Sequence, residues 1–252
     1  MLFARLFHVE QRQKPWLVFL HGLLGNHHDW DNVITNFSDF PCLAVDLPGH
    51  GQSRATSVVD FAGFNCLFTD LLKTHEVESY YLIGYSLGGR LAMHYTCTNE
   101  TVKPCGLFIE SAHPGLTNAD EKMARCTHDA QWALRFRQEP MEKVLRDWYQ
   151  QPVFADLSIS ARATRIAERR DNDGQGVAAL LTATSLGKQP DLAPKLRALR
   201  QPLFYVCGER DQKFSTLATS FPHRIITHAG HNVHADNPQA FCQQLRSFIT
   251  PI

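Results

Sequence analysis

The chain has 252 residues, of which 44% are hydrophobic and 20% are charged, a composition suited to one globular domain with a large core. Lys and Arg together number 25, and so do Asp and Glu. This balance excludes an overall field that would draw the protein to nucleic acid or to an anionic membrane. No apolar stretch reaches the roughly 18 residues of a membrane span, and the N-terminal residues lack the apolar run of an export signal.

Cysteine usage indicates a reducing compartment. The cysteines are odd in number, scattered along the chain and without a C-x-x-C pair, so we expect buried free thiols and neither a structural zinc site nor a redox disulfide. They are Cys42, Cys66, Cys97, Cys105, Cys126, Cys207 and Cys242. The predicted location is therefore the cytoplasm.

Short apolar runs that end in turns follow one another along the chain, as expected for strands buried on both faces of a parallel sheet. These runs are 16–20, 42–46, 80–83, 106–110 and 202–207. Helix-length segments separate them, such as 60–75, where apolar residues recur at helical spacing. The alternation predicts an α/β fold with a mostly parallel, doubly wound sheet.

The alternation is interrupted between about residues 114 and 201. Several amphipathic helix candidates occur there without a clear buried strand, and most of the charged residues fit a solvated surface. We expect an inserted helical lid within a single domain that spans residues 1–252, because no linker or repeat indicates a second one.

Ser86 lies at a predicted strand-to-helix junction, between Gly84 and Gly88. This G-x-S-x-G pattern is typical of a nucleophile elbow, a strained turn in which side chains at the flanking positions would collide with the strand and the helix. A bare match is common by chance, and an ordinary helix N-cap serine gives the same letters. Other residues of the chain are needed to distinguish a nucleophile elbow from an ordinary helix N-cap.

A serine hydroxyl needs an imidazole to accept its proton and a carboxylate to orient that imidazole. Asp211 follows the apolar run 202–207, and His231 follows another short apolar stretch. The order Ser86, Asp211, His231 is the order found in α/β-hydrolases. We therefore expect these residues to form a catalytic triad.

A second turn, His21-Gly22-Leu23-Leu24-Gly25, follows the run 16–20, where an oxyanion-hole loop is expected. Two converging N–H groups are needed to stabilise a developing negative charge. We assign them to the backbone of Leu23 and of Leu87, the residue after the serine.

Histidines raise a competing metal-site hypothesis. His228, His231 and His234 recur every three residues, and His27 adjoins His28. The carboxylate or cysteine ligands that usually complete such sites are missing from these patterns. We expect no metal and no cofactor.

With these residues in hand, the chain resembles the α/β-hydrolases and, among them, the 2-succinyl-6-hydroxy-2,4-cyclohexadiene-1-carboxylate synthase family of menaquinone biosynthesis. The resemblance covers almost the whole chain. It is carried by 16–22, 45–51, 84–90, 113–116 and 147–154, of which the last two segments and Arg90 discriminate best.

The resemblance implies a carbon-oxygen lyase. It would release pyruvate from 2-succinyl-5-enolpyruvyl-6-hydroxy-3-cyclohexene-1-carboxylate by proton abstraction, with the triad and a set of arginines. Matching positions imply that the substrate contacts are Tyr85, Arg90, Arg125, Trp148 and Arg169. Arg170, next to Arg169, is the alternative for the last of these. Guanidinium groups suit a polycarboxylate substrate because their paired donors match carboxylates. The expected partner is this small molecule, bound by a monomer.

Two other functions stay open at the level of sequence. A serine esterase or C–C hydrolase would use the same triad but form an acyl-enzyme. A non-catalytic ligand-binding protein would keep the fold without turnover, since fold alone does not prove activity.

Overall fold

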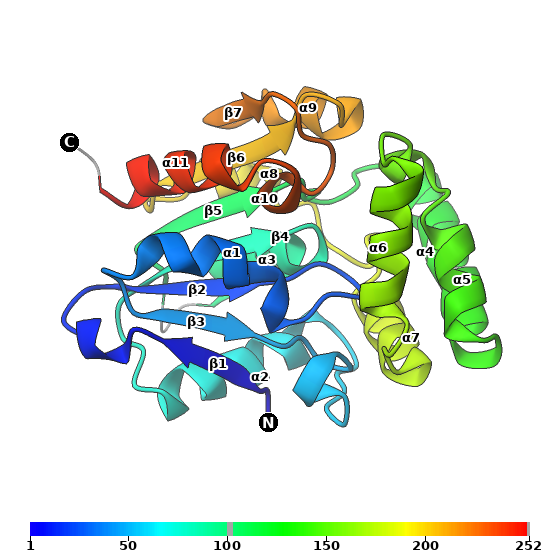
Figure 1. Cartoon of the computed structure of the whole chain (residues 1–252), viewed down its shortest axis with the longest axis horizontal. Coiled ribbons are helices and arrows are strands. Elements are labelled where there is room, and N and C mark those ends of the chain that lie inside the picture. Colours follow the sequence, from blue (N-terminus) through cyan, green and yellow to red (C-terminus); the bar gives the residue numbers. More distant parts are fainter. Residues whose placement is uncertain (100–102, 251–252) are drawn as a thin grey trace.

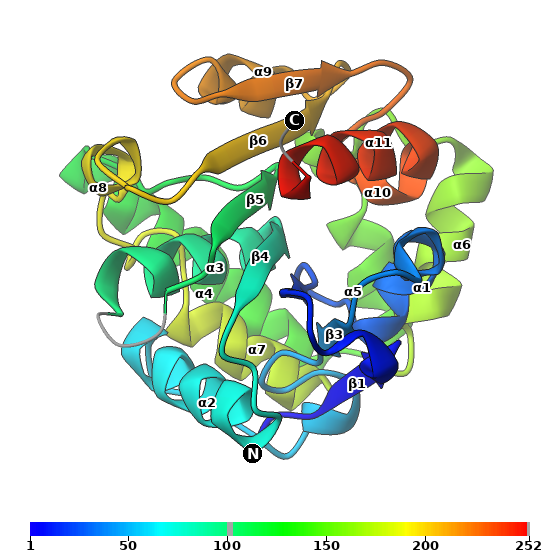
Figure 2. The ribbon, with the colours of Figure 1, turned by 90° about the vertical axis from the view of Figure 1, so that its left-hand side faces the viewer.

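The computed structural model describes residues 1–99 and 103–250, and within these ranges the chain forms a seven-stranded sheet. The strand order is β1-β3-β2-β4-β5-β6-β7, in which β1 is antiparallel to β3 and the other neighbours are parallel (Figure 1). The bounds are β1 Ala4–Phe7, β2 Trp16–Leu20, β3 Cys42–Val45, β4 Tyr80–Tyr85, β5 Gly106–Glu110, β6 Leu203–Gly208 and β7 His223–Ile226. Figure 2, seen from the end opposite the lid, shows the strands fanning out from β1 to β7 as the sheet twists.

The central strands form because their apolar runs are covered on both sides. Every residue of β2, β3 and β5 is buried, as a parallel sheet with helices on both faces requires. The five predicted runs all coincide with strands to within two residues at either end. The prediction of a mostly parallel α/β sheet is thus confirmed, whereas the edge strand β1 was not predicted.

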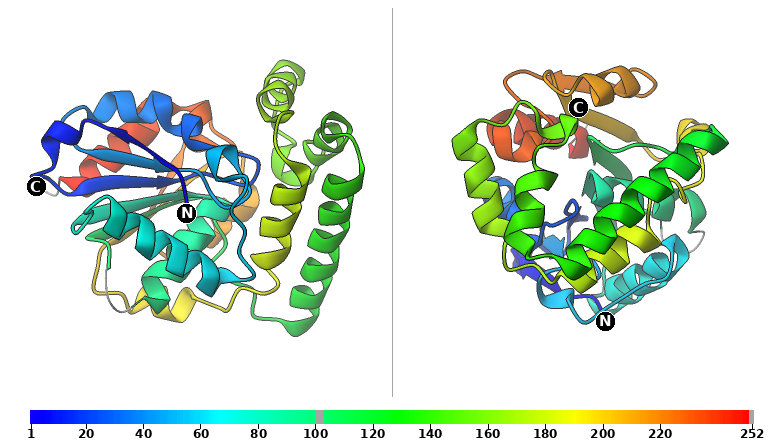
Figure 3. Two further views of the ribbon diagram at one scale, coloured as in Figure 1. Left: turned by 90° about the horizontal axis from the view of Figure 1, so that it is seen from below. Right: turned by 90° about the vertical axis from the view of Figure 1, so that its right-hand side faces the viewer.

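Helices cover the two faces of the sheet, as the left panel of Figure 3 shows. One face carries α2 (Phe61–Thr74), α3 (Leu87–Thr98) and α8 (Ala193–Arg197), and the other carries α1 (Asp31–Ile34) and α11 (Pro238–Ile249). The remaining helices of the core are short: α9 (Gln212–Ala218), α10 (Val233–Asp236), η1 (Val9–Gln11), η2 (His27–Trp30), η3 (Thr35–Phe37) and η4 (Gly51–Ser53).

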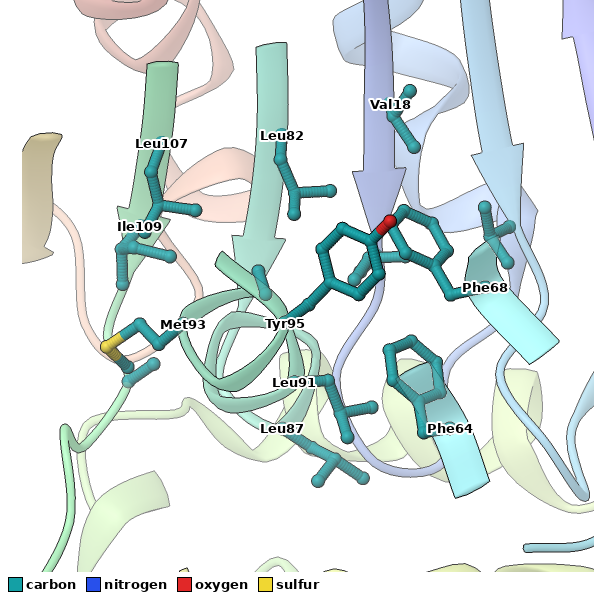
Figure 4. Packing of buried hydrophobic residues seen from close by; sticks show 14 of the residues in the cluster. Val18, Phe64, Phe68, Leu82, Leu87, Leu91, Met93, Tyr95, Leu107 and Ile109 are labelled. Carbon is teal, nitrogen blue, oxygen red and sulfur yellow. The ribbon is translucent and has the colours of Figure 1, made fainter. Parts of the chain in front are cut away.

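The helix after the elbow is fixed by aromatic packing. Tyr95 of α3 meets Phe68 of α2 edge to face, with ring centroids 4.8 Å apart, and Phe64 stacks on Phe68 (Figure 4). Leu91 of α3 and Leu82 of β4 belong to the same cluster. Buried aromatic pairs stabilise a fold by more than the area that they bury. These contacts therefore hold α3 in a fixed position on the sheet.

Four helices form a lid beyond the carboxyl ends of the strands (Figure 1, and facing the viewer in the right panel of Figure 3). They are α4 (Ala119–Gln138), α5 (Met141–Trp148), α6 (Ile159–Arg169) and α7 (Gly174–Ala183), with η5 (Pro152–Phe154) between α5 and α6. Asn118, Ser158 and Asp173 cap α4, α6 and α7 by accepting backbone N–H groups. The lid has its own apolar cluster, which Leu24 of the core joins.

The predicted insertion at 114–201 therefore contains the lid, but α8 near its end packs against α3 of the core. Residues 100–102 and 251–252 of the predicted single domain lie outside the described residues. No described helix is both long enough and apolar enough to cross a membrane.

The cysteine prediction was partly wrong. All seven cysteines are free, but only Cys42, Cys207 and Cys242 are buried, while Cys66 and Cys105 are exposed. The exposed pair shows that an apolar neighbourhood in sequence does not decide which face of an element points inward.

Candidate active site

Ser86 occupies a strained turn between β4 and α3. Its backbone has φ 50° and ψ −110°, a conformation that residues with a Cβ rarely adopt. The Ser86 N–H donates to the carbonyl oxygen of Glu110 at 2.9 Å, and the Arg90 N–H donates to the carbonyl oxygen of Ser86 at 3.0 Å. The neighbouring strand and the first turn of the helix thus hold the serine in this conformation.

The flanking glycines allow a close approach of backbones. A Cβ on Gly84 would lie 2.7 Å from the carbonyl oxygen of Gly88, and a Cβ on Gly88 would strike the carbonyl oxygens of Leu20 and His21. Larger residues would push α3 away from the loop after β2. The spacing of the two glycines therefore serves the elbow, as predicted.

The structure brings the three predicted triad residues together. His231 Nε2 lies 3.2 Å from Ser86 Oγ, and His231 Nδ1 lies 2.6 Å from Asp211 Oδ2. Asp211 follows β6 and His231 lies in the loop after β7, and the Arg210 N–H joins these two loops by donating to the carbonyl oxygen of Ala229. Both triad partners of the serine are only 6% exposed, so a proton can pass from Ser86 to an imidazole that its carboxylate orients.

The loop after β2 is held by two buried histidine rings. His50 Nε2 accepts the Leu24 N–H at 3.0 Å, and His21 Nε2 accepts the Leu47 N–H at 3.0 Å. Burial, followed by the neighbouring His21, lowers the pKa of His50 to about 3. A neutral ring is what an acceptor nitrogen requires.

The predicted oxyanion donors have N–H groups that are available. Leu23 lies in this loop and Leu87 is the first residue of α3, and among the described residues neither backbone N–H donates a hydrogen bond within the protein. Unpaired N–H groups at a helix N-terminus suit an anion. Their role as an oxyanion hole stays a prediction.

A pocket opens beside the triad, between the core and the lid, with a volume of about 510 Å³ including its open mouth. Its wall is formed by Leu23, Asp29, Tyr85, Trp148, Tyr149, Phe154, Asp156, Leu157, Arg165, Arg169, His231, Asn232 and Asp236.

Three predicted substrate contacts line this pocket, namely Tyr85, Trp148 and Arg169. Tyr85 packs against the His231 ring at 5.5 Å, and burial, followed by Glu110, raises the pKa of its phenol. Arg170 has an exposed side chain and does not belong to the wall. Of these two neighbouring arginines, Arg169 is the one in the pocket wall, and its contact with substrate stays a prediction.

Arg169 forms a buried ion pair across the pocket wall. Its NH2 group lies 2.6 Å from Asp29 Oδ1, with side chains 7% and 10% exposed. Burial by itself would raise the pKa of Asp29, but the Arg169 guanidinium and weaker effects of neighbouring groups together lower it. Both groups are therefore charged.

Arg90 and Arg125 lie apart from the wall of this pocket. Buried Arg90 donates to the carbonyl oxygen of Thr184 at 2.7 Å, and Arg125 donates to Asp129 at 2.8 Å. Burial, followed by the charge of Arg125, lowers the pKa of Arg90 to about 9. The two guanidinium groups thus form a separate basic cluster where the lid meets α3.

Sequence reasoning missed several residues of the wall. Arg165 lies one helical turn before Arg169 on α6, a four-residue spacing that could have indicated a shared face. Tyr149 and Phe154 lie in segment 147–154, which the resemblance singled out without assigning them a role, whereas Asp29, in η2, gave no signal.

The histidines of the metal hypothesis have other partners. His231 contacts Asp211, while His234 contacts Glu110 and His27 contacts Asp46 through ring nitrogens. Among the residues that the structure describes, no three potential ligands group together around a possible metal position.

Comparisons with known proteins agree on the family. A model of the alpha/beta hydrolase fold family matches residues 15–238. The 2-succinyl-6-hydroxy-2,4-cyclohexadiene-1-carboxylate synthase of Serratia proteamaculans is 46% identical over 251 residues, covering 99% of this chain and 98% of that protein. The protein of the same name from Pectobacterium atrosepticum is 48% identical over 239 residues, covering 94% of each chain.

Solved structures give the same result. MenH from S. aureus superposes with a TM-score of 0.88 at 25% identity, covering 99% of this chain and 98% of its own. A thermophilic esterase from Thermogutta terrifontis superposes with a TM-score of 0.81 at 18% identity, covering 98% and 92%, a likeness of fold alone. The chain therefore belongs to the α/β-hydrolase fold family and, within it, to the family of 2-succinyl-6-hydroxy-2,4-cyclohexadiene-1-carboxylate synthases.

Proposed function

We propose that this chain is a carbon-oxygen lyase of menaquinone biosynthesis. It eliminates pyruvate from 2-succinyl-5-enolpyruvyl-6-hydroxy-3-cyclohexene-1-carboxylate and leaves 2-succinyl-6-hydroxy-2,4-cyclohexadiene-1-carboxylate. The observation that carries this proposal is the 46% identity, over 99% of the chain, to a synthase of that name. The triad geometry and the guanidinium groups next to it supply suitable chemistry.

The reaction begins with removal of the ring proton α to the succinyl ketone. Ser86 Oγ takes this proton while its own proton passes to His231 Nε2, which Asp211 orients through Nδ1. The distances of 3.2 Å and 2.6 Å along this chain support the transfer. The product of this step is an enolate, and the imidazolium of His231 balances its charge.

The enolate oxygen accepts hydrogen bonds from the Leu23 and Leu87 N–H groups. Such donors stabilise an enolate as they would a tetrahedral oxyanion, and one of them is typically worth about 3 kcal/mol. Electrons then return through the ring alkene and break the C–O bond to the side chain. The expelled enolpyruvate takes up the proton that His231 had gained and becomes pyruvate, which restores the neutral imidazole, so no acyl-enzyme forms and no water is consumed.

The substrate carboxylates bind to the guanidinium groups of Arg169 and of the cluster formed by Arg90 and Arg125. Arg169 lies in the wall of the pocket with Tyr85 and Trp148. Arg90 and Arg125 form the separate cluster where the lid meets α3, and there Arg90 has only neutral oxygen acceptors within hydrogen-bond distance. Paired N–H donors of this kind match carboxylates and hold the ring in line for elimination.

The test is direct. The purified protein is given the enolpyruvyl cyclohexene substrate, and pyruvate is followed by coupled oxidation of NADH. We expect catalytic release of pyruvate without a burst. A burst of p-nitrophenol from a p-nitrophenyl ester, with an acyl adduct on Ser86 and no pyruvate from the cyclohexene, would instead identify a hydrolase.

The chain is further expected to act as a monomer in the cytoplasm on this one small molecule. Its free thiols, two of them exposed, support a reducing compartment. Sedimentation equilibrium measures the mass in solution and so tests the monomer. If the protein instead retained the substrate without forming product, it would be a binding protein.

A further inference from the structure

The pocket wall contains a carboxylate that its proposed substrate does not explain. Asp29 lies in η2, just after the oxyanion loop, and lines the pocket together with Arg169 of the lid. A polycarboxylate ligand would be repelled by a bare carboxylate at this position. The charge of Asp29 must therefore be balanced by a cationic side chain of the protein, and the same side chain can bind a carboxylate of the ligand.

Other carboxylates of the wall have different partners. Asp156 faces Arg210 at 3.4 Å, and Asp236 accepts the Gly230 N–H at 2.8 Å. Asp29 instead forms its ion pair with Arg169, which is the more deeply buried of the two arginines in the wall. Arg165, the second arginine, is 22% exposed and pairs with Glu168 at the surface.

A guanidinium offers five N–H donors in one rigid plane. On Arg169, one NH2 group is engaged by Asp29, and both side chains are nearly buried. This contact holds the guanidinium while its other donors are left for a ligand. Fixing it in advance lowers the entropy lost when a carboxylate binds.

The same contact joins the lid to the oxyanion loop. Arg169 is the last residue of α6, and Asn172, just beyond it, donates to the carbonyl oxygen of Leu24 at 2.9 Å. Asp29 and Leu24 belong to the segment that carries the predicted oxyanion donor Leu23. A carboxylate bound to Arg169 therefore has a fixed position relative to the reacting centre.

We propose that Asp29 is a positioning residue, which holds the Arg169 guanidinium at the pocket wall so that it can bind a substrate carboxylate. This inference rests on the proposed function for the identity of the substrate, but not for the ion pair itself.

Steady-state kinetics of pyruvate release separates this role from a merely structural one. Asp29→Asn keeps an oxygen that can accept a hydrogen bond but removes the negative charge of the carboxylate. The Arg169 guanidinium is then no longer held in its orientation. We expect KM to rise about tenfold or more, as for a lost hydrogen bond to a charged group, with little change in kcat. In the double variant with Arg169→Gln, KM should be no higher than in Arg169→Gln alone, because both changes remove one interaction.

A matched control exists far from the pocket. Asp39 and Arg246 form an ion pair at 2.8 Å that joins the segment after η3 to α11. Asp39→Asn should leave kcat and KM unchanged, although it removes the same charge. If Asp29→Asn also leaves KM unchanged, the positioning role is refuted.

Binding measurements make the outcome independent of turnover. Isothermal titration with 2-succinylbenzoate, an aromatic compound that carries a ring carboxylate and a succinyl carboxylate, should give a Kd about tenfold weaker for Asp29→Asn than for the unaltered chain. If binding depends on Asp29 but no pyruvate is released by the unaltered chain, the proposed function fails and the inference stands. If the unaltered chain releases pyruvate but KM and Kd are unchanged in the variant, the inference fails and the proposed function stands.

Thermal unfolding of each variant checks that the fold is kept. If Asp29→Asn does not fold, Asp29→Glu replaces it, because this variant keeps the charge but displaces the carboxylate by one methylene. KM should rise here as well. Full affinity in Asp29→Glu would show that charge alone matters, and would overturn the positioning role.

Discussion

At the scale of the residue, Ser86 shows how function conflicts with local stability. Its φ of 50° is unfavourable for any side chain with a Cβ, and the surrounding strand and helix impose it. A glycine would adopt this conformation at little cost. The strained position is therefore retained for the hydroxyl group that projects from it.

Two substitutions separate the strain from the chemistry. Ser86→Ala and Ser86→Gly should both lower pyruvate release by about a thousandfold or more, because the proton acceptor is lost. Ser86→Gly should in addition be more stable than Ser86→Ala by about 1 kcal/mol, since it relieves the positive φ. Turnover and urea unfolding measure the two effects. Near-normal pyruvate release by either variant would remove Ser86 from the mechanism.

At the scale of the element, the loop after β2 depends on neutral histidines. The His50 ring accepts a backbone N–H of this loop, and its pKa is lowered to about 3, first by burial. Burial also lowers the pKa of His21. The folded state keeps these rings unprotonated. It therefore loses stability in the pH range in which the histidines of the unfolded chain bind protons.

The sign follows from the two pKa values of His50, which are the ordinary 6.5 in the unfolded chain and about 3 in the folded one. Its contribution is complete above pH 6.5 and falls as the pH is lowered towards 3, by about 1.4 kcal/mol per pH unit. Between pH 6.5 and 5, the free energy of unfolding in urea should fall less in His50→Gln than in the unaltered chain, by about 1.5–2 kcal/mol. An equal fall in both proteins would contradict the neutral ring.

At the scale of the whole molecule, the lid and the core differ in how deeply their helices are buried. Two apolar clusters lie on the faces of the sheet, and a third, smaller one lies mostly within the lid and includes Leu24 of the core. Ten of the twelve residues of α3 are buried, whereas in α6, all of whose residues are described, Arg169 alone is buried. Local opening requires less free energy where fewer side chains are buried.

Hydrogen exchange should therefore be faster in α6 than in α3 and β4. Because α6 forms part of the pocket wall, its opening would let the substrate enter and the products leave. Exchange followed by mass spectrometry, with and without 2-succinylbenzoate, measures this difference, and the ligand should slow exchange in α6 selectively. Equal protection of α6 and α3 in the free protein would contradict a separately opening lid.

Much of the fold and of the triad could be predicted from the sequence, because both depend on local patterns. Continuous apolar runs predict buried strands, and the glycines around Ser86 predict the turn that exposes it. Chain order was enough to select Asp211 and His231, since the parallel sheet brings its loops to one edge. The edge strand β1 escaped prediction, as did the exposure of Cys66 and Cys105.

The sequence by itself thus determined the central parallel strands, the turn at Ser86 and the chain order of Ser86, Asp211 and His231, which are set by periodicity and by the geometry of single turns. Only the tertiary structure decided which arginines share a pocket. It separated Arg90 from Arg169 and paired Arg169 with Asp29, 140 residues away along the chain. Contacts between distant segments depend on how the lid packs on the core, and no local pattern encodes that packing.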